Sequence, residues 1–401
     1  MTAFMVQPVT SADYRRLAQK RLPRVLFDYI DGAANDETTL AANASDFQQI
    51  KLKQQVMRDV SAVDSRAVML GREYAMPVAL APVGMAGMMA RRGEVQAVRA
   101  ANAAKIPFTL STVGICSLEE VTAASTMPIW FQLYMVRDRD LVERLLQRAA
   151  AAGCENLLFT VDLPAAGARH RDQRNGMIGA GWKARLARAA YLASSPGWLL
   201  DVGLKGKPHD FGNLREVIQD ANDLNAYKAF IGAQFDPGVT WKDIAWLRSV
   251  WTGRILIKGI MTPEDAAAAV SAGADGVIVS NHGGRQLDSV PSTISALPDV
   301  VAAVGGSVEV YLDGGVRSGI DVVKAIALGA NGVLIGRPWV WSIAARGERG
   351  LTDLLAVFQR EIAVAMALMG VNRIADLTQE NLVNPAFAGR PWPRSDGAPG
   401  A

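Results

Sequence analysis

Short apolar segments of the strand type recur along the chain, and each is followed by a helix-like stretch. The strand-like segments are residues 77–82, 107–111, 129–134, 156–162, 254–258, 276–280, 308–313 and 332–336. The stretches between them are Ala-rich and amphipathic, and several end in an Ala-Gly or Leu-Gly step, a common helix stop. Clear examples are residues 93–104, 138–152, 263–272 and 318–328.

Eight strand-then-helix units with continuously apolar strands predict an α/β fold with a parallel sheet closed into a (β/α)8 TIM barrel. A doubly wound open sheet is the rival architecture. It is disfavoured by the number of units and because no Gly-x-Gly-x-x-Gly motif follows the first strand.

Three segments lie outside this repeat. Before the barrel, which begins at about residue 75, residues 22–29 resemble a helix with Pro23 near its start, so we expect an N-terminal helical extension. A long insertion, residues 165–240, follows the fourth strand, and such lengths are typical of lids, binding loops or disordered segments. The Pro-, Gly- and Ala-rich residues 385–401 predict a flexible tail. We therefore expect one domain over residues 1–384.

The composition narrows the class of protein. Half of the 401 residues are apolar and 20% are charged, which allows a large core, and a net charge of +3 is too small to indicate nucleic-acid binding. No apolar run of about 18 residues predicts a bilayer-spanning helix, and the N-terminus lacks the apolar core of a secretory signal. Cys116 and Cys154 lack metal-site spacing, so a reducing cytosol is a simpler interpretation than a disulfide.

The insertion concentrates the positive charge of the chain. Residues 165–210 hold eight Lys or Arg and three Asp or Glu. Trp182, Tyr191 and Trp198 are interleaved with these basic residues, a mixture that suits an anionic membrane surface. A solvated lid whose aromatic side chains pack on the barrel rim is an equal alternative.

Polar side chains gather where the predicted strands end. Barrel enzymes build their active sites at this end of the strands. Strand ends that are merely exposed to solvent would also be polar. Many of these residues can act as acids, bases or ligands, however, which favours an active site. They are Ser111, Gln132, Tyr134, Thr160, Asp162, Lys258, Ser280, His282, Asp313, Gly336 and Arg337.

The motif Ser-Asn-His-Gly-Gly-Arg-Gln-Leu-Asp, residues 280–288, follows the sixth strand and brings a base close to a cation. His282 can accept a proton, and Arg285 can hold a carboxylate through two parallel hydrogen bonds. Asp162 can stabilise the imidazolium, and Arg169 offers a second guanidinium. These residues predict a small carboxylic acid as substrate. The other histidines, at positions 170 and 209, lie in the insertion, so no metal site is expected.

A phosphate site is indicated by residues 313–317, Asp-Gly-Gly-Val-Arg, and by Gly336-Arg337, because barrels often bind phosphate between the last two strand-end loops. Lys258 ends a buried apolar run and must meet an anion. Three interpretations are open for it: a Schiff base, stabilisation of negative charge on a cofactor ring, or a salt bridge with Asp275 or another acid.

With these motifs, the chain resembles the FMN-dependent L-2-hydroxy acid oxidases and dehydrogenases, over about residues 13–379. Residues 280–288 match the signature of that family, and residues 131–134, 160–162, 257–259 and 313–317 support the match. Within the family it looks most like the bacterial quinone-linked L-lactate dehydrogenases. The segments that indicate this are residues 81–84, 90–97, 130–134, 201–204 and 206–210.

The resemblance implies FMN as cofactor and a role for each matching residue. His282 would be the base, with Asp162 as its partner, and Tyr134 would bind the substrate hydroxyl. Arg285, Arg169 and Tyr29 would hold the carboxylate. Without the resemblance, packing in the core is the simpler interpretation of Tyr29. Lys258 would stabilise the anionic reduced ring. The remaining flavin ligands would be Val83, Gly84, Ser111, Gln132, Thr160 and Ser280, and the ribityl and phosphate ligands Asp313, Gly315, Arg317, Gly336 and Arg337.

The resemblance also implies oxidation of L-lactate to pyruvate and a homotetramer. The basic, aromatic insertion favours a quinone as electron acceptor and a peripheral position on the cytoplasmic side of the bacterial inner membrane. An oxidase in the cytoplasm that uses dioxygen, or one acting on glycolate, mandelate or 4-hydroxymandelate, is the alternative. Two departures concern the substrate pocket. Val113 stands where glycolate oxidase has Trp, and His170 replaces a Tyr of the lactate enzymes.

Overall fold

The computed structural model describes residues 7–177, 181–215 and 234–383. At its centre is a parallel eight-stranded sheet with the strand order β4-β11-β10-β9-β8-β7-β6-β5. A backbone bridge between Leu80 and Phe108 joins the two outermost strands and closes the barrel. The predicted (β/α)8 barrel is confirmed. Its strands are β4 Val78–Leu80, β5 Thr109–Ser111, β6 Trp130–Tyr134, β7 Asn156–Thr160, β8 Arg254–Ile260, β9 Gly276–Ser280, β10 Glu309–Asp313 and β11 Gly332–Ile335.

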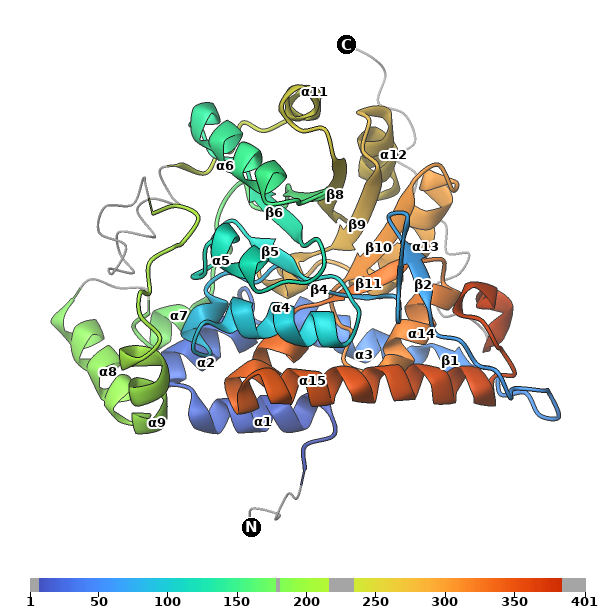
Figure 1. The fold of residues 1–401 in the computed structure, drawn as a ribbon, viewed down its shortest axis with the longest axis horizontal. Helices are drawn as coiled ribbons and strands as arrows, with labels where there is room; N and C mark the ends of the chain where they lie inside the picture. Colours follow the sequence, from blue (N-terminus) through green and yellow to red (C-terminus); the bar gives the residue numbers. More distant parts are fainter. Residues whose placement is uncertain (1–6, 178–180, 216–233, 384–401) are drawn as a thin grey trace.

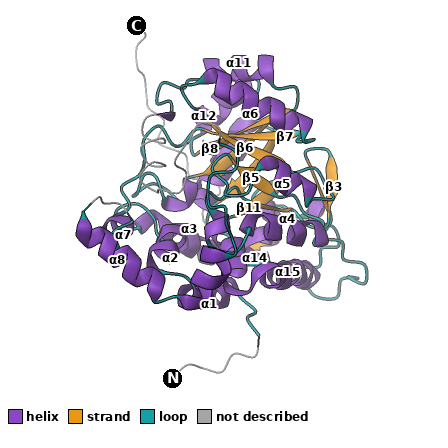
Figure 2. Ribbon diagram, turned by 60° about the vertical axis from the view of Figure 1, so that its left-hand side comes forward, coloured by secondary structure: helices purple, strands orange, loops and turns teal. Residues whose placement is uncertain are grey.

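Helices surround the strands on the outside (Figures 1 and 2). Several begin where the sequence supplies a capping side chain: Asp138, Thr262 and Ser318 each accept a hydrogen bond from the backbone N–H three residues later. The barrel helices are α4 Gly93–Ala103, α5 Leu118–Ala123, α6 Arg139–Ala151, α11 Lys242–Val250, α12 Pro263–Ser271, α13 Thr293–Val304, α14 Gly319–Ala327 and α15 Arg337–Leu368.

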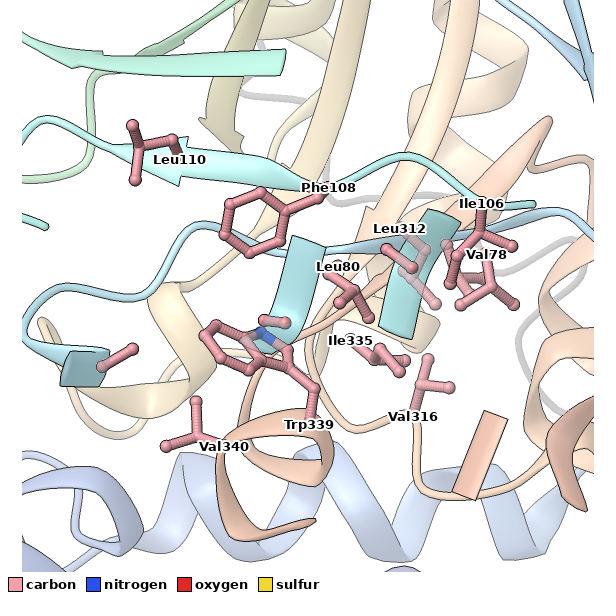
Figure 3. Packing of buried hydrophobic residues seen from close by; sticks show 14 of the residues in the cluster. Val78, Leu80, Ile106, Phe108, Leu110, Leu312, Val316, Ile335, Trp339 and Val340 are labelled. Carbon is pink, nitrogen blue, oxygen red and sulfur yellow. The ribbon is translucent and has the colours of Figure 1, made fainter. Parts of the chain in front are cut away.

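Apolar side chains of β4, β11 and the β5 region pack against the start of α15 (Figure 3). The Trp339 ring meets Phe108 edge-on, with 6.1 Å between centroids and 77° between planes. Its Nε1 donates to the Ala81 carbonyl at 3.1 Å. The indole is therefore buried without an unpaired donor.

A hairpin closes the end of the barrel where the strands begin. Its strands, β2 Ala67–Met69 and β3 Arg72–Tyr74, are joined by Leu70 and Gly71, both with positive φ, as a tight two-residue turn requires. Met69, Leu70 and Tyr74 form a buried cluster with Trp130 and Tyr311. A ligand must therefore enter from the opposite end, where the strands finish.

The N-terminal residues form the predicted helical extension. Figure 1 shows α1 alongside α15. The helix expected after Pro23 is confirmed as α2. The elements of this region are α1 Ser11–Arg21, α2 Arg24–Asp31, α3 Thr38–Ser45, η1 Asp46–Gln49 and β1 Lys51–Leu52. Strand β1 pairs with β12 Leu382–Val383, at the end of the described residues. Short helical turns are η2 Ala86–Met88, η4 His282–Gly284, η5 Ile374–Asp376 and η6 Gln379–Asn381.

The described part of the insertion contains α7 His170–Arg174, α8 Trp182–Ala193, α9 Pro196–Trp198 and the π-helical turn η3 Leu199–Leu204. Trp198 is buried and its Nε1 donates to the Met88 carbonyl, as rim packing predicts. Trp182 and Leu186 are 70% and 63% exposed, and Leu200 and Leu204 are 58% and 59% exposed. The buried Trp198 therefore agrees with a lid that packs on the barrel rim, whereas the four exposed side chains agree with a membrane-facing surface.

Within the described ranges, no helix has the length and apolarity needed to cross a membrane. Cys116 and Cys154 are both buried and are not joined in a disulfide. The predicted flexible tail, residues 385–401, lies outside the described residues.

Candidate active site

His282 and Asp162 face each other at the mouth of the barrel, in the loops after β9 and β7. His282 Nδ1 lies 2.8 Å from Asp162 Oδ1, and His282 Nε2 lies 3.5 Å from the Tyr134 hydroxyl. Burial, with Lys258 and Arg285, lowers the pKa of His282 although Asp162 raises it, so the imidazole is neutral at pH 7. Because an ionised carboxylate only accepts, Nδ1 carries the proton and Nε2 is left as the basic atom.

Two guanidinium groups lie over the Tyr29 ring, with the Cζ of Arg285 5.0 Å and the Cζ of Arg169 5.9 Å from its centroid. Arg285 Nη1 donates to the Gly32 carbonyl at 3.0 Å, which anchors the side chain. Burial, and then repulsion from Arg169, lowers the pKa of Arg285 to about 10. Two half-buried cations that repel each other are a natural binding site for a carboxylate.

Lys258 belongs to a second buried group. Its Nζ lies 2.7 Å from Asp313 Oδ2 and 2.9 Å from Ser280 Oγ. Burial alone would lower its pKa, but Asp313 and Asp162 raise it, so Lys258 is a cation. A protonated amine is not a nucleophile, which argues against a Schiff base. The specific pairing with Asp275 is wrong because Asp275 pairs with Arg248, whereas another acid, Asp313, does bind Lys258.

A cavity of about 630 Å³ joins these groups. Most of the residues expected from the sequence line it: Tyr29, Val83, Gly84, Tyr134, Thr160, Arg169, Lys258, His282, Arg285, Asp313, Gly315, Arg317, Gly336 and Arg337. Four expected residues do not line it. Asp162 and Ser280 instead bind His282 and Lys258. Ser111 and Gln132 are hydrogen-bonded to each other, with Ser111 Oγ donating to Gln132 Oε1.

The cavity suits a flat polar cofactor that carries a phosphate. Gln132 Nε2 and Thr160 Oγ1 are buried without a hydrogen-bond partner among the described residues, and a ring with carbonyl and N–H groups would satisfy them. A Cβ on Gly84 would lie 2.7 Å from Val113 Cγ2, so only glycine permits this close approach.

Two further arginines line the cavity, and burial lowers the pKa of Arg317 to about 10 and that of Arg337 well below its usual value. Arg285 and Arg317 add to the effect at Arg337 by repulsion. An anion beside these groups would relieve the repulsion, as expected for a phosphate. Arg337 also donates to the carbonyls of Ile30, Gly283 and Gly32, so it joins α2 to the loop of residues 281–288, called the catalytic loop below.

Sequence reasoning missed several cavity residues of the insertion and its surroundings. The Phe235 ring lies 5.1 Å from the Tyr134 ring, and Arg137, Leu163 and Met177 also line the cavity. Phe235 and Met177 come from a segment without strand-end periodicity, so no local pattern marked them. Arg137 lies three residues after Tyr134, and this position near a strand end was the available signal.

Together, the closed barrel, the cavity lined by cationic groups and the His–Asp pair with two arginines nearby describe a barrel enzyme that acts on small carboxylic acids. The model of the family described as FMN-dependent dehydrogenase matches residues 18–384. The chain belongs to this family, and it is an FMN enzyme that oxidises L-2-hydroxy acids.

Similar proteins agree with this assignment. An L-lactate dehydrogenase of Caulobacter sp. (strain K31) is 52% identical over 373 residues, which are 93% of this chain and 98% of that protein. An L-lactate dehydrogenase of Alcaligenes faecalis is 50% identical over 374 residues, with the same coverage. A solved structure of monotopic membrane protein (S)-mandelate dehydrogenase has a TM-score of 0.87 at 36% identity, and covers 94% of this chain and 100% of its own.

Proposed function

We propose that this enzyme oxidises L-lactate to pyruvate, with His282 as the base. The observation that carries the proposal is the His282–Asp162 pair, 2.8 Å apart, whose histidine lines the same cavity as Arg285 and Arg169. The relatives named L-lactate dehydrogenase support lactate as the substrate. Their identity of about half extends over nearly the whole chain.

The cavity residues would act together as follows. Arg285 and Arg169 would bind the substrate carboxylate and so fix the orientation of its α-carbon in the cavity. His282 Nε2 takes a proton from the substrate, and Asp162 stabilises the imidazolium that forms. The Tyr134 hydroxyl, 3.5 Å from Nε2, lies where it can bind the oxygen of the substrate hydroxyl.

The remaining predicted ligands would hold FMN, which supplies the two-electron acceptor when it is bound. Gln132, Thr160 and Ser111, with the backbone of Val83 and Gly84, would hold its ring. Lys258, held by Asp313 and Ser280, would offset negative charge on the reduced ring. Arg317, Arg337 and Gly336, with Gly315, would bind the ribityl chain and phosphate.

We further propose that electrons pass to a quinone and that the insertion rests on the membrane surface, on the cytoplasmic side of the bacterial inner membrane. The support is the exposed apolar set Trp182, Leu186, Leu200 and Leu204 in a basic segment. A similar structure described as a monotopic membrane protein gives further support. A soluble oxidase that reduces dioxygen is the competing function. A homotetramer remains our expectation for the assembly, with a solution mass about four times the 42.8 kDa of one chain.

A panel of substrates tests the proposal. L-Lactate, glycolate, (S)-mandelate and 4-hydroxymandelate are each mixed anaerobically with the FMN-loaded protein, and loss of the oxidised flavin absorbance is followed. We expect L-lactate to give the highest kcat/KM. A preference for mandelate would refute lactate as substrate, and a flavin that no 2-hydroxy acid reduces would refute the function itself.

A further inference from the structure

The catalytic loop has an unfavourable backbone conformation. His282, Gly283 and Gly284 have φ values of 55°, 64° and 76°, so three consecutive residues are left-handed. Glycine adopts this conformation without strain, but histidine does not. Such a turn persists only where the surrounding structure holds it, and strain of this kind is typical of functional sites. The residues that hold the turn therefore also hold the base.

We infer that Asn43 of α3 and Asn281 of the loop form an amide pair that positions His282. Asn43 Nδ2 donates to Asn281 Oδ1 at 2.8 Å, and Asn281 Nδ2 donates to Asn43 Oδ1 at 2.9 Å. Asn43 is 1% exposed and Asn281 is 6% exposed. This buried reciprocal contact holds Asn281, the residue before His282, against α3. The two asparagines are 238 positions apart in the sequence.

Other hydrogen bonds connect the amide pair to the left-handed turn. Asn281 Oδ1 also accepts from Gly284 N at 3.1 Å, which closes the turn around His282. Asn281 Nδ2 donates to the Pro291 carbonyl, and Asn43 Oδ1 accepts from Thr293 N. The two side chains thus join α3, the catalytic loop and the start of α13. Each amide nitrogen and oxygen of the pair has at least one hydrogen-bond partner, so one orientation of the loop is strongly preferred.

Asp288, the last residue of the signature motif, binds the same helix from the other side of the loop. Its carboxylate accepts hydrogen bonds from the backbone N–H of Thr39 at 2.8 Å and from the Thr38 hydroxyl at 2.9 Å. Glu37, at the N-cap position of α3, makes no side-chain capping bond. Asp288 therefore caps α3 from a distant part of the chain.

Backbone packing leaves little space between α3 and the loop. A Cβ on Gly284 would lie 2.8 Å from Leu40 N, and the Gly284 carbonyl accepts from Ala34 N at 2.9 Å. Asn43, Asn281 and Asp288 do not line the cavity. They are positioning residues, which act on substrate only through His282 and Arg285. The inference rests on the proposed role of His282 as base.

Asn43→Ala tests the amide pair in the FMN-loaded enzyme, with hydrogen exchange and kinetics measured on the same samples. Exchange of the peptide covering residues 281–288 is expected to become about tenfold faster, because Gly284 N–H loses its fixed acceptor. Turnover per bound flavin is expected to fall by roughly ten- to a hundredfold, since a base misplaced by about 1 Å loses that much. KM should change less than kcat.

Asn331→Ala is the matched control. Asn331 Oδ1 accepts from Val310 N at 2.8 Å, at the end of the barrel where the strands begin. This variant also loses one side-chain to backbone bond, but exchange of residues 281–288 and turnover should stay as in the wild type. If Asn43→Ala does not fold, Asn43→Ser replaces it, because a hydroxyl retains part of the hydrogen bonding.

Two results would overturn the inference: unchanged exchange of residues 281–288 in the Asn43 variant, or unchanged turnover per bound flavin despite faster exchange. The exchange measurement does not depend on turnover. An inactive wild-type enzyme would therefore refute the proposed function, while the test of the loop itself still gives an answer.

Discussion

At the scale of single residues, substrate binding depends on how Arg285 is held. Nη1 is fixed on the Gly32 carbonyl at 3.0 Å, and the side chain lies over Tyr29. Arg285→Lys keeps the charge but loses the planar fork, and a charged hydrogen bond is worth about 1.5–3 kcal/mol. We expect the KM for L-lactate to rise roughly ten- to a hundredfold, with a smaller change in kcat. Steady-state kinetics check this, and an unaltered KM would count against the assignment.

The pH dependence of activity follows from the surroundings of His282. Its pKa is lowered from 6.5, chiefly by burial, so the base is neutral and active at pH 7. As pH falls through this lowered pKa, the imidazole becomes protonated and kcat/KM should decrease, with the acid limb below pH 6.5.

Asp162→Asn sharpens this test because Asp162 is the group that raises the pKa of His282. Removing its charge should move the acid limb to still lower pH and reduce kcat, since the imidazolium loses its partner. Profiles of kcat/KM against pH for both proteins measure the shift. A limb that moves to higher pH in the variant would contradict the account.

The residues that sequence could predict are those at strand ends. Asp162 and His282 were expected there because the repeat of apolar strands fixes where each strand finishes. The hydrogen bonds between Asn43 and Asn281 were not expected, because partners 238 positions apart leave no local signal. The left-handed φ of His282 was not expected either. The neighbouring glycines indicate a turn, but they do not show that the histidine shares its left-handed conformation.

At the scale of elements, the barrel strands and their helices were predictable because their periodicity repeats. The position of the insertion was predictable too, but the surroundings of its side chains were not, since its sequence fits two environments. Trp198 packs on the carbonyl of Met88, whereas Leu200, two residues later, is 58% exposed. A pattern of aromatic and basic residues does not separate these cases, because packing against η2 decides which side chains are covered.

The exposed leucines of the insertion give an experimental test of membrane contact. Burying a leucine side chain is worth roughly 1.5–3 kcal/mol, so Leu200→Ser should weaken binding to anionic lipid vesicles by about tenfold. Leu368→Ser on α15 is a matched control, because Leu368 is 57% exposed against 58% for Leu200. Vesicle co-sedimentation measures both. Equal losses in the two variants, or no vesicle binding by the wild type, would exclude the insertion as a membrane surface.

At the scale of the whole molecule, the electron acceptor distinguishes a dehydrogenase from an oxidase. With L-lactate as donor, we expect rapid reduction of a soluble quinone analogue and little hydrogen peroxide in air-saturated buffer. Both products are measured in parallel at equal enzyme concentration. Peroxide formed rapidly and in proportion to pyruvate would replace the quinone proposal with the oxidase function.

The most direct test of the central claim is rapid anaerobic mixing of L-lactate with FMN-loaded wild-type enzyme and with His282→Gln, followed by flavin absorbance. The wild type should bleach quickly. Loss of a general base typically costs about 10²–10⁴-fold, so the variant should bleach more slowly by that factor while still binding FMN. Bleaching of His282→Gln at the wild-type rate would contradict His282 as the base.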